Sequence, residues 1–128
     1  MPAGVRSRSF VSLRDLPATI LDAAGLSDPV GFPRRSLARY WRHAGEEPAG
    51  DPVFAEAHQV FDDVPATYPT VKGKMRSVIS DGMQYIRNYG DGREELFDLN
   101  RDSKATEDLA SVKPDGLDRQ RRRLEQLP

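Results

Sequence analysis

The sequence predicts a small α+β domain built on an antiparallel sheet. Three observations predict this class. Residues alternate between apolar and polar through much of the segment 74–99, two Gly-containing turns interrupt that segment, and helix-period apolar patterns stand before and after it. The predicted strands cover about residues 53–59, 74–80, 83–89 and 94–99, of which the last three form a meander and the first is a candidate fourth strand. The predicted helices cover about residues 15–24 and 116–127.

The first helix has clear start and stop signals. Asp15 is a suitable N-cap, and Ser12, one turn earlier, is an alternative cap. Leu16 and Ile20 follow at helical spacing, and Gly25 supplies the stop. The resulting apolar stripe is strong for so short a helix, so the helix needs a substantial surface to pack against.

The strands are divided by turn chemistry. Asp81-Gly82 separates two alternating runs, and such a pair predicts a type I′ hairpin, because that turn needs positive φ at both central residues. A looser Gly-rich turn over residues 89–92 precedes the last strand. In the final helix Leu117, Leu124 and Leu127 fall near one face, which could cover one side of the sheet.

Composition limits the class of function. The 128 residues suit one ordinary domain, and a net charge of −1 lacks the basic field typical of nucleic-acid binding. The absence of Cys excludes disulfides, thiolate metal sites and cysteine nucleophiles. No apolar run approaches about 20 residues, so no membrane span is expected. The first residues lack the apolar core of a secretory signal, so the chain as it stands is expected in the cytoplasm.

One segment has the spacing of a calcium loop. Asp98, Asn100 and Asp102 occupy the first, third and fifth positions of an EF-hand loop. Ser103 stands where the turn glycine belongs, however, and Leu109 replaces the bidentate glutamate. The preferred interpretation is therefore a polar turn whose Asn and Asp cap a short acidic helix that follows.

Other polar residues give no catalytic constellation. His58 shares a strand face with Glu56 but lacks a third ligand, so no metal site is predicted in this chain. The basic run at 119–123 is interpreted as a solvated helix face.

Five segments, taken in order, resemble the end of the sulfatase family, the arylsulfatase-like hydrolases of the alkaline phosphatase superfamily. They are "VSLRDLPATILDAAGL", "RRSLARYW", "DPVFAEAH", "RSVISDGMQYIRN" and "EELFDLNRDSKATEDLA". The resemblance implies that residues 1–50 correspond to the end of a catalytic domain. Residues 51–128 would then form the C-terminal antiparallel-sheet subdomain, which shapes the substrate pocket in this family.

The same resemblance implies that catalytic residues lie elsewhere. The family nucleophile belongs to a Cys/Ser-x-Pro-x-Arg motif, and the nearest match, "SDPVG" at 27–31, has Gly31 in place of Arg. No catalytic residue is therefore assigned, and calcium is expected in the catalytic domain rather than here. The chain would be inactive alone and would need a separate sulfatase catalytic domain as its partner. Whether it should be called an enzyme is left open.

Three residues are candidates for contact with an anionic sulfate ester. They are His58, Lys72 and Lys74, from the segment 58–74, because cations and hydrogen-bond donors favour an anion. Two other functions stay open. One is a free-standing interaction module that binds a protein or an anionic glycan, and the other is the tail of a phosphoesterase or phosphonate hydrolase. The fragment hypothesis also predicts an exposed apolar face on the helix at 15–24.

Overall fold

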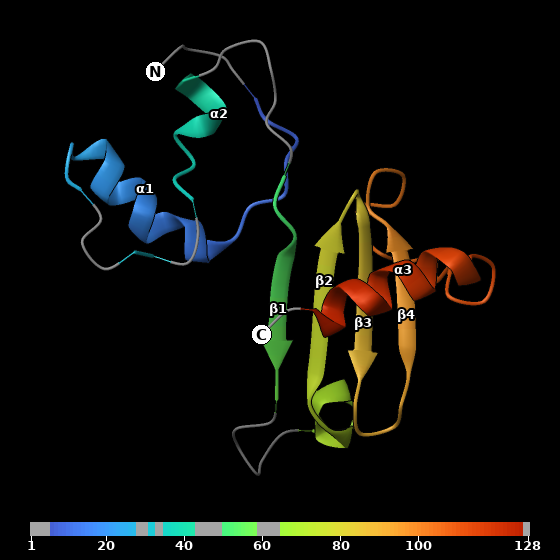
Figure 1. Cartoon of the computed structure of the whole chain (residues 1–128). Helices are drawn as coiled ribbons and strands as arrows, with labels where there is room; N and C mark the ends of the chain where they lie inside the picture. Colours follow the sequence, from blue (N-terminus) through green and yellow to red (C-terminus); the bar gives the residue numbers. More distant parts are fainter. Residues whose placement is uncertain (1–5, 28–30, 33–34, 43–49, 59–64, 127–128) are drawn as a thin grey trace. The chain divides into compact units, whose positions relative to one another are not determined.

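A computed structural model describes residues 6–27, 31–32, 35–42, 50–58 and 65–126. The chain divides into an N-terminal unit, Met1–Asp51, and a C-terminal unit, Pro52–Pro128. Figure 1 shows their elements, which are treated separately below. Among the described residues, no helix is long and apolar enough to cross a membrane.

The N-terminal unit begins with a capped turn. A 3-10 turn, η1 (Leu13–Asp15), leads directly into helix α1 (Leu16–Ala23). The Ser12 hydroxyl accepts from the backbone N–H of Arg14 at 3.2 Å, and the Ser12 N–H donates to the Asp15 carboxylate at 2.8 Å. Of the two predicted caps, Ser12 is thus the one used. Asp15 is its reciprocal partner and makes no side-chain cap bond to α1.

Polar contacts connect α1 to the next helical turn, α2 (Arg39–Arg42). The Thr19 hydroxyl accepts from the Leu37 N–H at 2.9 Å, and Arg42 pairs with Asp22 at 2.6 Å. Ala38 is the one described hydrophobic residue of this unit that is buried. The apolar side chains of α1 therefore contribute little to a core within the unit.

The C-terminal unit is a four-stranded antiparallel sheet with one long helix (Figure 1). Its elements are β1 (Val53–Ala57), η2 (Pro69–Lys72), β2 (Met75–Ser80), β3 (Met83–Asn88), β4 (Glu94–Asp98) and α3 (Pro114–Glu125). The strands lie in sequence order, so the meander and its fourth strand are confirmed. The first strand ends at Ala57, two residues before its predicted end at 59, which lies outside the described residues.

The core lies between the sheet and α3. Val78, Tyr85 and Leu96 are cross-strand neighbours, and all three are fully buried. Leu124 of α3 packs against this row, and α3 crosses β2, β3 and β4 (Figure 1). Each such buried side chain contributes about 1.5–3 kcal/mol, so this row provides much of the unit's stability. The predicted helix cover is confirmed, while Leu127 lies outside the described residues.

The predicted type I′ turn is present between β2 and β3. Asp81 and Gly82 have φ values of 54° and 75°, both in the left-handed region that this turn requires. A Cβ on Gly82 would lie 1.9 Å from Nδ2, the side-chain amide nitrogen of Asn100. Asn100 therefore packs on the turn, and a side chain at Gly82 would displace it.

The segment after β4 turns as predicted, but the prediction of a short acidic helix in this segment is wrong. Residues 103–112 form turns, and Ala105 has a φ of 52°, which interrupts a right-handed helix. Asp102 accepts hydrogen bonds from the N–H groups of Thr106 and Glu107 at 2.6 and 2.8 Å. Its carboxylate thus stabilises the turn.

The interpretation of 119–123 as a solvated helix face holds only for part of the run. The Arg121 guanidinium donates two hydrogen bonds, both 2.8 Å long, to the Glu94 carboxylate. Arg123 pairs with Asp81 at 2.7 Å, and buried Gln120 hydrogen-bonds Ser80. These residues attach α3 to the sheet, while Arg119 and Arg122 are exposed.

Candidate functional site

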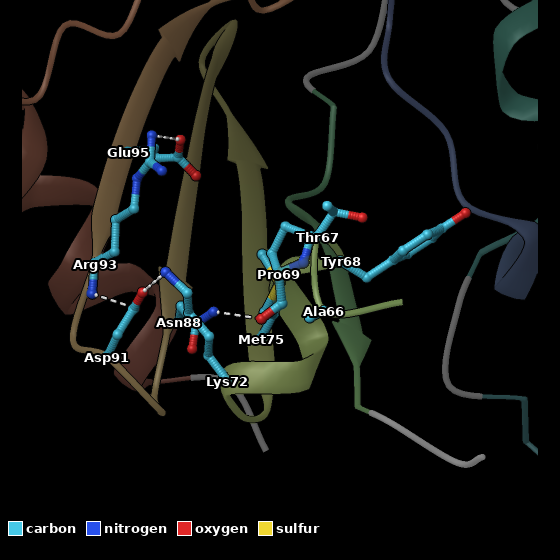
Figure 2. A pocket seen from close by; sticks show the side chains of 10 residues that line it. All are labelled: Ala66, Thr67, Tyr68, Pro69, Lys72, Met75, Asn88, Asp91, Arg93 and Glu95. Atoms are coloured by element: carbon cyan, nitrogen blue, oxygen red, sulfur yellow. Dashed lines mark hydrogen bonds and ion pairs between the residues drawn. The ribbon is translucent and has the colours of Figure 1, made fainter. Parts of the chain in front are cut away.

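A pocket of about 180 Å³ opens at one end of the sheet, where segment 66–72 approaches the turn between β3 and β4 (Figure 2). Met75, Asn88 and Glu95 contribute to it from three strands. Each of these positions alternates with the residues that face α3, so the pocket lies on the opposite face of the sheet. The covered face holds the core, and the other face holds this pocket.

The wall of the pocket is formed by hydrogen bonds from the Asn88 side chain to the backbone and by a close approach of two backbone segments. The Asn88 side chain, which is buried, donates to the Pro69 carbonyl at 2.9 Å and accepts from the Gly90 N–H at 2.9 Å. A Cβ on Gly90 would lie 1.5 Å from the Lys72 carbonyl oxygen. Only glycine permits this approach. The contact between segment 66–72 and the β3–β4 turn therefore depends on Gly90 as well as on the Asn88 hydrogen bonds.

Charged side chains line the pocket in two pairs (Figure 2). Lys72 pairs with Asp91 at 2.9 Å, and Arg93 pairs with Glu95 at 2.7 Å. The backbone N–H of Arg93 also donates to Asp91 at 3.0 Å. The Lys72 ammonium, followed by this backbone N–H, lowers the pKa of Asp91, so its carboxylate is ionised at neutral pH. Among the lining residues that the structure describes, two cations balance two carboxylates.

The structure separates the three residues predicted to contact substrate. Lys72 lines the pocket, as Figure 2 shows. Lys74 pairs with Glu56 at 2.8 Å and does not line it. The Lys74 ammonium lowers the pKa of Glu56. His58 is exposed just after β1 and is not brought to the pocket either.

Sequence reasoning missed most of the polar lining. Asn88, Arg93 and Glu95 flank the predicted Gly-rich turn, Asp91 lies within it, and none of the four was singled out. A signal was available, because alternation along β3 and β4 places residues 88 and 95 on one face of the sheet. What the sequence could not show is that segment 66–72 folds back onto this face.

A shallow apolar groove of about 170 Å³ lies on the same face of the sheet. Ala55, Ala57, Met75 and Ile86 are its hydrophobic lining residues, and Met75 is shared with the pocket. Across the part of the chain that the structure describes, no group of three or more His, Asp or Glu residues could hold a metal ion.

Sequence comparison finds no matching family model and no matching curated protein. Solved structures do match. A 2-O GAG sulfatase is 24% identical with a TM-score of 0.69, over 87% of this chain and 23% of that chain. A sulfatase-like protein from Bacteroides thetaiotaomicron is 25% identical with a TM-score of 0.70, over 87% and 23%. A phosphonate monoester hydrolase from Silicibacter pomeroyi is 19% identical with a TM-score of 0.64, over 88% and 24%.

These matches define the fold. Nearly all of this chain superposes on sulfatase structures, so the predicted resemblance to a portion of the sulfatase family is confirmed at the level of the fold. The chain spans less than a quarter of the length of each of these three structures. The α+β scaffold is also similar to that of a phosphonate monoester hydrolase, so the fold alone does not distinguish the two kinds of hydrolase.

Proposed function

We propose that this chain is the C-terminal part of a sulfatase-like sulfuric-ester hydrolase and completes the substrate pocket of a catalytic domain. The observation that carries the proposal is the match of 87% of the chain to a 2-O GAG sulfatase with a TM-score of 0.69. The sequence resemblance, which runs through five segments in the family's order, supports the C-terminal placement.

The chain alone would not hydrolyse a sulfate ester. It has no Cys, and Gly31 stands where the nucleophile motif of the family requires Arg. The nucleophile and the calcium ion that the family uses would both come from the catalytic domain. This chain would supply binding contacts near the ester, with Lys72 as the candidate that faces a pocket.

The exposed apolar residues of the N-terminal unit support a protein partner. Ile20 is 65% exposed, Leu13 is 84% exposed and Leu26 is 61% exposed. Grouped apolar exposure around one helix is typical of a protein interface. In this proposal the catalytic domain covers the helix that the sequence predicted to be unpartnered.

The test is reconstitution. The reading frame upstream of the Met1 codon would be sequenced and expected to encode Cys/Ser-x-Pro-x-Arg with an Asp-rich metal site. Its product, co-expressed with this chain and calcium, is expected to hydrolyse an aryl sulfate, whereas each product alone does not. Hydrolysis by the purified chain alone, above a mock purification, would contradict the proposal.

A phosphonate hydrolase is the second candidate, because one structural neighbour is a phosphonate monoester hydrolase. The reconstituted pair would be assayed with a phosphonate monoester beside the aryl sulfate. Cleavage of the phosphonate alone would favour this alternative. If no catalytic frame exists, the exposed residues around α1 would instead favour an interaction module.

A further inference from the structure

We propose that the pocket between segment 66–72 and the β3–β4 turn binds an uncharged sugar ring through its hydroxyl groups, rather than a sulfate group. The inference rests on the proposed function in one respect only, namely that the sugar belongs to the substrate of the hydrolase. The sequence predicted that Lys72 contacts an anionic sulfate ester. The inference instead assigns Lys72 to hydrogen bonds with sugar hydroxyl groups.

The charges of the lining argue against a sulfate. Lys72 and Arg93 are the cations among the described residues of the lining, and each already has a carboxylate partner within 2.9 Å. A sulfate placed on either cation would lie beside Asp91 or Glu95. Like charges at such separations repel, and their repulsion offsets the attraction of the paired cation.

The hydrogen-bonding groups of the lining match a hydroxyl instead. A sulfate only accepts hydrogen bonds, whereas a hydroxyl donates one and accepts others. The Lys72 ammonium has three N–H groups and the Arg93 guanidinium has five, of which each uses one in its ion pair with a carboxylate. The Asp91 and Glu95 oxygens can accept further bonds. Adjacent donors and acceptors of this kind suit vicinal hydroxyls.

The size and surface of the pocket suit a single ring. Its volume of about 180 Å³ is below the roughly 300–1,000 Å³ of sites that enclose drug-sized ligands. Ala66, Pro69 and Met75 add apolar surface to the lining, against which the C–H face of a sugar can pack. The Asn88 bonds to Pro69 and Gly90 hold the walls in place before a ligand arrives.

The three methionines of the chain make a direct binding measurement possible. Met75 lines the pocket, whereas Met83 packs against the core on the opposite face of the sheet. The full chain, with isotope-labelled methionine methyl groups, would be titrated by NMR with N-acetyl-D-glucosamine, with its O-sulfate ester and with inorganic sulfate. The neutral sugar is expected to shift Met75 saturably and to leave Met83 unchanged.

Two further results are expected from the native chain. The sulfate ester should bind no more than about threefold more tightly than the neutral sugar, because the charges of the described lining residues balance. Raising the salt concentration from about 0.05 M to about 0.5 M should leave neutral-sugar binding unchanged, because no charge is neutralised.

The variant Asp91→Asn tests the charge argument. It leaves Lys72 unpaired and gives the pocket a net positive charge, so the sulfate ester should gain affinity about tenfold and acquire a salt dependence. Neutral-sugar binding should fall several-fold. Glu125→Gln, which makes the same change in net charge on α3, is the matched control and should change neither affinity. An unchanged Met83 signal would verify the fold of each variant.

Two outcomes would overturn the inference. Sulfate-ester binding to the native chain that is more than about tenfold tighter and strongly salt-dependent would show a sulfate site, which the proposed function accommodates. The absence of a saturable Met75 shift with any probe would show that the pocket does not bind sugars. Neither result bears on the reconstitution assay, so failure of the inference and failure of the proposed function remain distinguishable.

Discussion

The two units of this chain bury their apolar residues to very different extents. In the C-terminal unit, Val78, Tyr85 and Leu96 form a fully buried row under α3. In the N-terminal unit, Leu13 and Ile20 are mostly exposed. One unit thus contains its own core, whereas large apolar side chains of the other stay exposed.

The difference follows from the number of layers. A sheet and a helix can enclose side chains between them, as in the C-terminal unit. Helix α1 has only 8 residues and α2 only 4, and helices this short are marginal without tertiary support. Among the described residues of the N-terminal unit, a hydrogen bond from Leu37 to Thr19 and an ion pair between Arg42 and Asp22 connect α1 to the second helical segment.

Amide hydrogen exchange of the full chain should show the largest difference between the units. Amides of β2 and β3 are expected to exchange only by global unfolding, whereas those of α1 should exchange at least about a thousandfold faster through local opening. The measurement is residue-resolved exchange by NMR at neutral pH. Equal protection of the α1 amides and the central-strand amides from exchange would contradict the difference between the two units.

Truncating one apolar side chain in each unit should have unequal effects. Leu96→Ala leaves a cavity beneath α3 and should lower the free energy of unfolding by about 2–5 kcal/mol. Ile20→Ala, at a side chain that is 65% exposed, should change it by less than about 0.5 kcal/mol. Denaturant unfolding followed by circular dichroism would measure both. A comparable loss for Ile20→Ala would mean that α1 is packed against something within the chain.

The ion pair that attaches α3 to the sheet should contribute next. Glu94 accepts hydrogen bonds from Arg121 and from the Tyr85 hydroxyl. The Arg121 hydrogen bonds, and then the Tyr85 hydroxyl, lower the pKa of Glu94 from 4.5 to about 2 against the opposing effect of burial. Glu94→Gln should therefore cost about 2 kcal/mol at pH 7, a value reduced for partial exposure to solvent.

The pH dependence of this contribution has a definite sign. Because the folded state lowers the pKa of Glu94, the stabilisation is complete above about pH 4.5 and is lost as pH falls towards about 2. Glu94→Gln should remove that part of the acid sensitivity. Glu125→Gln, whose ion pair with Arg87 is 3.9 Å long and exposed, should change stability by less than about 0.5 kcal/mol. Equal acid sensitivity of the native chain and Glu94→Gln would contradict the assignment.

A local effect, without a change in the stability of the sheet, is expected inside the N-terminal unit. Thr19→Ala removes the hydroxyl that accepts from the Leu37 N–H, which should cost about 1 kcal/mol locally. Exchange of the Leu37 amide should become about fivefold faster, while the unfolding midpoint of the sheet stays unchanged. A shift of that midpoint would show that the two units unfold together, which contradicts the proposed difference in their stability.

The sequence by itself determined the sheet. Period-two alternation and the Asp81-Gly82 turn predicted the meander because strand pairing across short turns depends on neighbours along the chain. The same is true of the apolar stripe of α1 and the face of α3 that carries Leu124. These features require only backbone preferences and the separation of apolar from polar residues.

Only the tertiary structure decided how the polar residues are used. Arg121 pairs with Glu94, which lies 27 positions earlier in the sequence, and Lys72 pairs with Asp91, which lies 19 positions later. No local pattern distinguishes these cations from Arg119 or Lys74, because the pairing depends on where segment 66–72 and α3 dock on the two faces of the sheet. Long-range docking brings together side chains that periodicity treats as equivalent, and it thereby determined which lysine faces a pocket and which arginine supports the core.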